Sequence, residues 1–561
     1  MRLSRRQVIR SAAALAAVPF ASSRALAALT QERPDLVLRN GRILTMDPRQ
    51  PQAEAAAISG EHLLAVGSNT EIGALAGSGT KVVDLGGKTV TPGFIDGHCH
   101  PAVSGRMHLR MIDCDLRSIA AIQDAVRERA AKTPPGEWVV GFKYDDTKTA
   151  ERRFITREDL DTAAPDHPVY IQHRGGHTGY VNSLALAKAG ITEATPDPKG
   201  GKLGRDPATG RLTGRLLERA AGALEDSIPA FGSTTREEDR AAVKLITQLF
   251  AKAGVTSSTD AFGTPDDLRA YQDARETGDL STRIYCMIGY PHIDKMIASG
   301  VRTGFGDDWV RVGGMKQVCD GSISERTARL SQPYVGRPYD FGIIVADADE
   351  LYGYARKAHQ AGWQLGTHAN GDVGIGMVCD LYERLQREMP RRDPRYRIEH
   401  CTVVNDALVA RMKALGAIPT PFASYVYFHG EKMPEYGEER LNHMFALRSF
   451  IDAGIRPTMG SDYPPGPFEP MMALQSMVTR TAIDGHVWGP KQRITVEEAL
   501  RVCTMNGAYA SYEEHLKGSL EPGKLADLVV LGRNPLTEDP SSLVTIPVER
   551  TMAGGRWVYE S

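Results

Sequence analysis

The sequence contains little that points to disulfide bonds, nucleic-acid binding or a membrane span. Its 7 cysteines are scattered, odd in number and without a CxxC pair, which excludes a disulfide framework and suggests small buried apolar residues. The 67 basic and 69 acidic residues nearly cancel, so no excess charge favours nucleic acid or a membrane surface as partner. No short-period repeat is visible. The 561 residues, 42% of them hydrophobic, predict a globular chain with a large buried core.

The N-terminus has the pattern of an export signal. Arg5 and Arg6 precede an apolar stretch over residues 13–20, and residues 25–27 (Ala-Leu-Ala) supply a small-x-small cleavage site. The apolar stretch is too short to span a bilayer. The paired arginines resemble a twin-arginine signal, although Val8 stands where that motif more often has Phe. We expect a cleaved signal peptide over residues 1–27, the twin-arginine machinery as a partner, and a periplasmic or secreted protein. The alternative is a basic amphipathic helix.

Both ends of the mature chain have the alternating pattern of β-strands. Apolar residues alternate over residues 35–46, where Asn40-Gly41 is a hairpin-turn signal, and over residues 55–66. The same pattern returns over residues 518–531 and 544–558. We predict a small β-sandwich domain formed from both chain ends, residues 28–88 and the part of 491–561 that follows a C-terminal helix.

Between the two ends, short apolar strands alternate with helical patterns, which favours a parallel α/β sheet. Nine candidate strands are present, one more than a (β/α)₈ TIM barrel needs. They cover residues 90–98, 169–173, 255–260, 283–288, 310–318, 363–368, 397–400, 417–421 and 457–462. The stretch 101–240 is too long for one crossover, so we assign residues 169–173 to an inserted subdomain after strand 1. The barrel then covers residues 89–490.

The motif His98-Cys99-His100 lies at the end of the first barrel strand, after a Pro-Gly turn. Residues i and i+2 on a strand point to the same face, so both histidines can bind one metal ion while Cys99 points away. A lone HxH also occurs as two surface or core histidines. Its place at the carboxyl end of a barrel strand favours the metal, because active sites of such barrels lie at that end.

Three further candidate ligands end later strands. They are His368, His400 and Asp462. Singly, each is explained by a buried core histidine or by an aspartate that caps a helix. Because one barrel rim brings the strand ends together, the set as a whole indicates a metal site.

At these positions the chain resembles the amidohydrolase superfamily, and the resemblance covers nearly the whole mature sequence. The segments that begin at Lys316, at His368-Ala-Asn370, at His177 and at Gly210 look like the subgroup that contains N-substituted formamide deformylases. The resemblance implies a metal-dependent hydrolase with two divalent ions, expected to be zinc. It implies that one ion is held by His98, His100 and Asp462, and the other by His368 and His400.

Lys316 needs separate treatment, because an ammonium group repels a cation. The resemblance implies that Lys316 is N-carboxylated by CO₂ and that the carbamate bridges both metals. The alternative is a lysine paired with the nearby Asp320.

The expected function is cleavage of a C–N bond in an N-substituted formamide, an acyl-amide or a related small molecule. Divalent cations lower the pKa of a bound water enough to give hydroxide at neutral pH, and they polarise the scissile carbonyl. Asp462 is the expected catalytic residue, taking the proton of the water and passing it to the departing nitrogen.

Four residues in motif loops are candidates for substrate binding: His177, Arg215, Arg326 and Asn370. A structural role is the alternative for each of them. Other functions stay open, namely a superfamily deaminase, a cyclic amidase or an exported binding protein without activity. Lys316 argues against a deaminase, which generally lacks a lysine on strand four and uses one metal.

Overall fold

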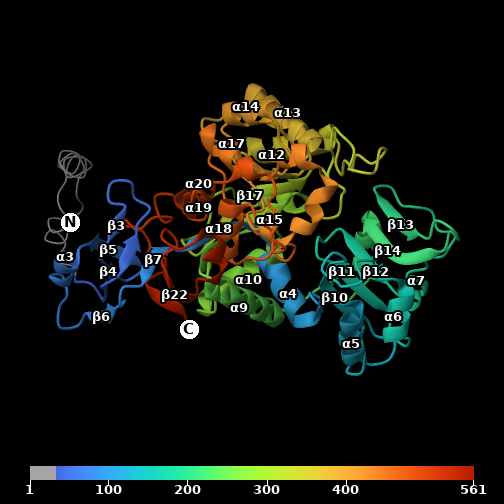
Figure 1. Cartoon of the computed structure of the whole chain (residues 1–561), viewed down its shortest axis with the longest axis horizontal. Coiled ribbons are helices and arrows are strands. Elements are labelled where there is room, and N and C mark those ends of the chain that lie inside the picture. The colour runs from blue at the N-terminus through green and yellow to red at the C-terminus, as the bar shows by residue number, and fades with distance from the viewer. Residues whose placement is uncertain (1–32) are drawn as a thin grey trace. The chain divides into compact units, whose positions relative to one another are not determined.

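A computed structural model describes residues 33–561 of the chain, so the predicted signal peptide lies outside the described residues. The described chain forms two compact units (Figure 1). The first joins the residues up to Gly93 with His515–Asn534 and Pro547–Ser561, and the second contains Phe94–Glu514 and Pro535–Ile546. All 7 cysteines are buried and free, as predicted. Within residues 33–561, no helix has the length and apolar character needed to cross a membrane.

The first unit is built from two β-sheets, and the larger of them contains strands from both chain ends. A four-stranded sheet has the order β5-β4-β1-β6, with β1 (Leu36–Arg39), β4 (Ala55–Ser59), β5 (His62–Gly67) and β6 (Lys81–Asp84). A six-stranded sheet has the order β23-β22-β21-β7-β2-β3, with β2 (Arg42–Leu44), β3 (Gln52–Ala53), β7 (Thr89–Pro92), β21 (Leu528–Leu531), β22 (Val548–Ala553) and β23 (Arg556–Glu560). Apolar side chains of both sheets, Leu38 and Val530 among them, share one core.

The second unit contains a sheet of seven parallel strands in the order β20-β19-β18-β17-β16-β15-β8. The strands are β8 (Phe94–Cys99), β15 (Val255–Gly263), β16 (Arg283–Gly289), β17 (Val310–Val318), β18 (Leu365–Ala369), β19 (Arg397–His400) and β20 (Ile418–Thr420). The helices between and after them include α4 (Pro101–Arg110), α9 (Arg236–Lys252), α10 (Pro265–Glu276), α12 (Ala348–Gln360), α13 (Asp372–Glu388), α14 (Asp406–Leu415) and α18 (Pro470–Thr479). Parallel strands alternating with helices are the arrangement that the sequence predicts.

Residues 457–462 occupy the eighth position and close the barrel. On one side, Thr458 N donates to Pro419 O at 3.1 Å and Gly460 N to Pro421 O at 3.2 Å. On the other, Asp462 N donates to His98 O and Gly97 N to Met459 O, both at 2.7 Å. The segment therefore bridges β20 and β8, and the predicted TIM barrel is confirmed.

The stretch after β8 forms a separate six-stranded sheet with the order β13-β14-β12-β11-β10-β9. Its strands are β9 (Ile112–Asp113), β10 (Val139–Tyr144), β11 (Val169–His173), β12 (Thr178–Val181), β13 (Gly201–Arg205) and β14 (Leu212–Glu218). Helices α5 (Ile119–Ala130), α6 (Arg157–Ala163), α7 (Ser183–Lys188) and α8 (Arg219–Glu225) accompany it. Residues 169–173 thus pair outside the barrel, where the sequence analysis places them.

The boundaries between the units differ from those predicted at residues 88 and 490. The predicted first strand, residues 90–98, divides at Gly93: β7 pairs with β21 in the first unit, whereas β8 begins the barrel. Two helices after residue 490, α19 (Val496–Val502) and α20 (Met505–Ala510), belong to the barrel unit. There Ile95 N of β8 donates to Cys503 O at 2.7 Å. Helix α20 packs closely against β8, since a Cβ on Gly507 would lie 2.6 Å from Ile95 Cγ2.

Candidate functional site

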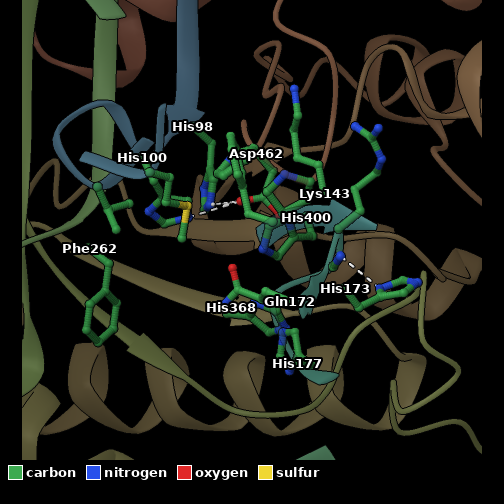
Figure 2. Close-up of a pocket in the computed structure, with 18 of the residues that line it drawn as sticks. His98, His100, Lys143, Gln172, His173, His177, Phe262, His368, His400 and Asp462 are labelled. Atoms are coloured by element: carbon green, nitrogen blue, oxygen red, sulfur yellow. Dashed lines mark hydrogen bonds and ion pairs between the residues drawn. The ribbon is translucent and has the colours of Figure 1, made fainter. Parts of the chain in front are cut away.

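Three predicted ligands meet where β8 ends. The Nε2 atoms of His98 and His100 lie 3.3 Å and 3.1 Å from Asp462 Oδ1. One donor atom from each residue lies within 4.8 Å of those of the others, close enough to hold one ion. Figure 2 shows the two histidines and Asp462 turned toward one another. His98 lies in β8 and His100 directly follows its last residue, Cys99, so the i and i+2 spacing places both imidazoles on the same side, as predicted.

The orientation of His98 is set by a buried carboxylate. Its Nδ1 lies 2.5 Å from Glu399 Oε2, and Glu399 in turn accepts from Arg397 Nε at 2.6 Å. Burial raises the pKa of Glu399, but the charges of Arg397 and His98 more than offset it, so the carboxyl stays ionised. A carboxylate on the second nitrogen of an imidazole is the arrangement that fixes metal-binding histidines.

This structure supports a cation between His98, His100 and Asp462. The Nε2 atom of His98 is buried, and among residues 33–561 it makes no well-aligned hydrogen bond, although Asp462 Oδ1 lies 3.3 Å away. A buried nitrogen without a partner is costly unless something else binds it. Two imidazoles and one carboxylate are ligands that zinc accepts.

The second pair of predicted ligands lies beside the first. The ring centroids of His400 and His98 are 4.6 Å apart, and those of His400 and His368 are 4.4 Å apart. Burial lowers the pKa of His368 to about 3 and that of His400 well below its usual range, so both imidazoles are neutral and able to bind a metal. Because His368 Nε2 donates to Gly321 O at 3.1 Å, its Nδ1 is left for an ion.

Lys316 lines the same cavity as the histidines. The alternative to a metal ligand is a lysine paired with Asp320, and that contact is absent from the described residues. Asp320 accepts backbone N–H groups from Arg329 at 2.9 Å, Asn370 at 2.9 Å and Gly371 at 2.8 Å. Burial lowers the pKa of Lys316. A larger fraction of its amine is therefore neutral than in a lysine exposed to water.

His177 points into the cavity from the inserted sheet. Its Nδ1 lies 2.8 Å from Glu218 Oε2, which leaves Nε2 to face the cavity (Figure 2). Burial lowers the pKa of His177, but the carboxylates of Glu218 and Glu325 outweigh burial and raise it to about 10. His177 is therefore a cationic donor beside His368, whose ring centroid is 6.2 Å away.

The other predicted substrate-binding residues differ in position. Asn370 lines a small cavity next to His177 and His368, and its Nδ2 donates to Gly321 O at 3.0 Å. Arg215 and Arg326 line neither of the two cavities around the candidate ligands. The Arg215 guanidinium lies 4.0 Å from the centroid of Phe154, and Arg326 pairs with Glu435. The structure thus gives both arginines partners elsewhere, which is the structural role weighed against substrate binding.

The cavity around the candidate ligands has a volume of about 240 Å³, enough for a small molecule. Sequence reasoning missed three carboxylates that orient its histidines: Glu218, Glu325 and Glu399. Glu399 directly precedes His400, and its place on a barrel strand is the only signal that could have found it. No local pattern marks Glu218 or Glu325, because strand pairing and loop packing bring them to their partners.

The model of the amidohydrolase family matches residues 81–559. The chain belongs to this family. It is 31% identical to the N-substituted formamide deformylase of Arthrobacter pascens, over 95% of this chain and 99% of that protein. It is 28% identical to the putative amidohydrolase YtcJ of Bacillus subtilis, over 93% and 99%.

A solved structure of a metal-dependent hydrolase also matches this chain. An uncharacterized metal-dependent hydrolase from Pyrococcus furiosus matches with a TM-score of 0.71 and 25% identity, over 90% of this chain and all of that one. The resemblance stated from the sequence is thereby confirmed, and so is the class of enzyme, a hydrolase that acts on carbon–nitrogen bonds.

Proposed function

We propose that this amidohydrolase cleaves the C–N bond of a small amide, with N-substituted formamides as the first class to test. The observation that carries the proposal is the meeting of His98, His100, Lys316, His368, His400 and Asp462 around one cavity at the carboxyl ends of the barrel strands. The relative from Arthrobacter pascens, named for the deformylation of such amides, supports the substrate class.

We propose two zinc ions. The first is assigned to His98, His100 and Asp462, the second to His368 and His400, and a carbamate on Lys316 is assigned to both. Cations held there would lower the pKa of a nearby water and place positive charge beside the scissile carbonyl. The low pKa values of His368 and His400 suit this role, because only a neutral imidazole can bind a metal.

The side chains then supply the proton transfers. Asp462 accepts a proton from the attacking water, whose oxygen bonds to the carbonyl carbon. The same proton passes from Asp462 to the nitrogen as the C–N bond breaks, giving an amine and a carboxylic acid. The Nε2–H of His177 faces the cavity and is placed to donate to the carbonyl oxygen, where negative charge develops.

A substrate screen tests the reaction. Zinc-reconstituted enzyme is assayed on N-formyl amines, N-acyl amines and an aminopyrimidine, with formate, carboxylate and ammonia as separate readouts. We expect formate release from N-formyl amines and about two zinc ions per active chain. Ammonia release from the aminopyrimidine alone, with one ion per chain, would instead establish a deaminase.

The carbamate on Lys316 has its own test. Enzyme prepared in ¹³C-bicarbonate is expected to show a carbamate carbon signal by NMR that disappears in Lys316→Ala. Lys143 is the matched control: it lines the same cavity, but its Nζ is paired with Asp113 Oδ2 at a distance of 2.6 Å. Lys143→Ala should therefore keep the signal, and a wild-type enzyme with two ions and no signal would refute the carbamate.

A further inference from the structure

A second cavity adjoins the one that holds the candidate metal ligands. It has a volume of about 190 Å³, and two of its lining residues, Phe262 and Val318, also line the metal-ligand cavity. The same two side chains thus form the partition between the cavities. Figure 2 shows the Phe262 ring pointing away from the histidines.

The place of the second cavity in the barrel ties it to the reacting centre. Phe262 and Val318 lie near the carboxyl ends of β15 and β17, where barrel enzymes bind their substrates. Tyr290 begins the short helix η1 (Tyr290–His292) after β16, and Tyr354 lies on α12, after β17. The cavity is therefore built from the same rim as the ligands, over neighbouring strands.

The wall of this cavity is aromatic. The ring centroids of Phe262 and Tyr290 are 6.1 Å apart at 82°, and those of Tyr290 and Tyr354 are 4.8 Å apart at 63°. A Cβ on Gly289 would lie 2.7 Å from the Phe262 ring, so the glycine lets that ring pack against β16. Edge-to-face rings of this kind leave room and contact area for one more ring.

The charged groups of the cavity stand at its rim. Arg219 and Glu350 are both exposed, and an Arg219 guanidinium nitrogen donates to Val345 O at 3.4 Å. The wall also contains the buried Gln317, whose Oε1 has no hydrogen-bond partner among residues 33–561. A charged substituent inside would lose water with no buried charge to pair with, whereas an apolar ring would gain contacts. The chemistry of the wall thus selects an uncharged aromatic group.

We propose that this aromatic side pocket (Phe262, Tyr290, Val318, Val345, Leu351 and Tyr354) binds an aryl-alkyl group carried by the nitrogen of the scissile amide. The inference rests on the proposed function. In a formamide the acyl carbon carries only hydrogen, so the nitrogen substituent is the one group large enough to reach a second cavity. The amide then lies at the metal ligands and its substituent passes beside Phe262.

Two substrates and three variants test the pocket. N-(2-phenylethyl)formamide carries the ring, and N-ethylformamide lacks it. Val345→Trp fills the pocket and Tyr354→Ala removes one wall. Tyr352→Ala is the matched control, because Tyr352 lies on the same helix but bonds to Glu388 outside the pocket. We expect the preference for the aryl substrate, as a ratio of kcat/KM, to fall about tenfold in Val345→Trp and about threefold in Tyr354→Ala.

The control and the small substrate make the result decisive. N-ethylformamide turnover should stay within about twofold of wild type in all three variants, and Tyr352→Ala should keep the aryl preference. An equal loss for both substrates in Val345→Trp would overturn the proposal, because it would mean damage to the reacting centre. The proposal would also be overturned if Val345→Trp lowered kcat/KM only for substrates that carry the aryl group on the acyl side of the amide.

A binding measurement separates failure of the pocket from failure of the proposed function. Calorimetry with 2-phenylethanol needs no turnover, and we expect Val345→Trp to weaken its binding at least tenfold while Tyr352→Ala leaves it unchanged. If no formamide is hydrolysed but this pattern holds, the reaction is wrong and the pocket stands. If the wild type binds no 2-phenylethanol, or all variants bind it equally, the pocket is refuted.

Discussion

At the scale of single residues, the site is held in a backbone conformation that ordinary residues avoid. Asp462 has φ +53° and His400 has φ +68°, both in the left-handed region. For residues other than glycine such geometry costs roughly 1–3 kcal/mol and persists only where the surrounding structure imposes it. The hydrogen bond of 2.7 Å from Asp462 N to His98 O is one such constraint. The barrel therefore sets the direction of these ligands.

Asp462→Asn tests the proton transfer most directly. The amide keeps the shape of the side chain but cannot accept the proton, so kcat should fall by about 10²–10⁴-fold. The fall should be steeper for amides than for activated esters, whose leaving group needs no proton. Asp372→Asn, at the start of α13, is the control and should keep kcat. Near-normal turnover of Asp462→Asn at full metal content, with a lowered melting temperature, would reduce Asp462 to a structural role.

Glu218→Gln tests the charge of His177. The carboxylate of Glu218 helps to raise the pKa of His177 to about 10, so the wild-type imidazolium persists through neutral pH and is lost only as the pH approaches 10. Without Glu218 that pKa falls, and kcat/KM should decline from about pH 7 upward, by roughly tenfold at pH 8.5. The exposed Glu193 gives the control, and Glu193→Gln should keep the wild-type pH profile. Identical profiles for Glu218→Gln and the wild type would contradict a role for the charge.

At the scale of elements, the loop that carries His177 is anchored to the barrel by one carboxylate. Glu325, in the segment after β17, accepts from His177 N at 3.0 Å and from Thr178 Oγ1 at 2.5 Å. His173 Nδ1 lies 3.4 Å away. These contacts join the end of β11 and the start of β12 to a barrel loop, and so hold the loop in place.

Glu325→Gln should destabilise the protein in a pH-dependent way. Burial raises the pKa of Glu325, but the charge of His173 and the hydrogen bonds outweigh it and lower the pKa to about 2. A depressed pKa adds stability at pH values above the ordinary pKa of 4.5, about 3 kcal/mol at pH 7, and this stability is lost as the pH falls toward 2.

The melting temperatures of wild type and Glu325→Gln should therefore differ at pH 7 and converge between pH 4.5 and pH 2. Glu128→Gln removes a fully exposed carboxylate that pairs with Lys132, and it should match the wild type throughout. A Glu325→Gln difference that stays constant with pH would show that ionisation of this carboxyl is not what stabilises the loop.

The elements were predictable where one local pattern decides them. Barrel strands appear in the sequence as short apolar runs. A residue at the end of such a run, such as His368, lies at the rim of the barrel independently of distant parts of the chain. The division of residues 90–98 at Gly93 was not predictable, because it depends on β7 pairing with β21, more than 400 residues away.

The same limit applies to the side chains of the site. The six candidate metal ligands could be predicted from their positions at strand ends. The partner of His177 could not, because it depends on the pairing of β12 with β14. That pairing sets Thr178 opposite Leu217 and so brings Glu218 beside His177. Arg215, Arg326 and His177 all lie in motif segments, and the sequence favours His177, in Gly-Gly-His, for contact with the substrate carbonyl. The packing agrees, because His177 lines the cavity and the two arginines do not.

At the scale of the whole molecule, export remains a prediction from the sequence. Arg5 and Arg6 before a short apolar stretch that ends near Ala27 predict a mature protein that begins near Ala28, outside the cytoplasm. N-terminal sequencing of the protein from a periplasmic fraction checks this. Arg5→Lys combined with Arg6→Lys should retain the precursor in the cytoplasm. A protein that still starts at Met1 in the exported fraction would contradict cleavage.

Metal removal should lower the stability of the barrel as well as its activity. Without a cation, the carboxylates of Asp462 and Glu399 are buried beside the imidazoles of the site. The His98 Nε2 atom then makes no well-aligned hydrogen bond among the described residues. A ligand that binds only the folded state adds about 3 kcal/mol when its free concentration is 100 times its Kd. Chelation should therefore lower the melting temperature by several degrees and abolish turnover, and added zinc should restore both.

Two histidine variants show whether this shift comes from the proposed site. His100→Ala removes one of the ligands that meet at Asp462, so zinc should no longer raise its melting temperature fully. His486→Ala removes an exposed imidazole that lies 3.4 Å from Asp484, and it should keep the whole zinc-dependent shift. If chelation strips the metal from the wild type and the melting temperature does not move, the cation contributes nothing to the fold. If His486→Ala loses the shift and His100→Ala keeps it, the stabilising ion binds somewhere other than the barrel rim.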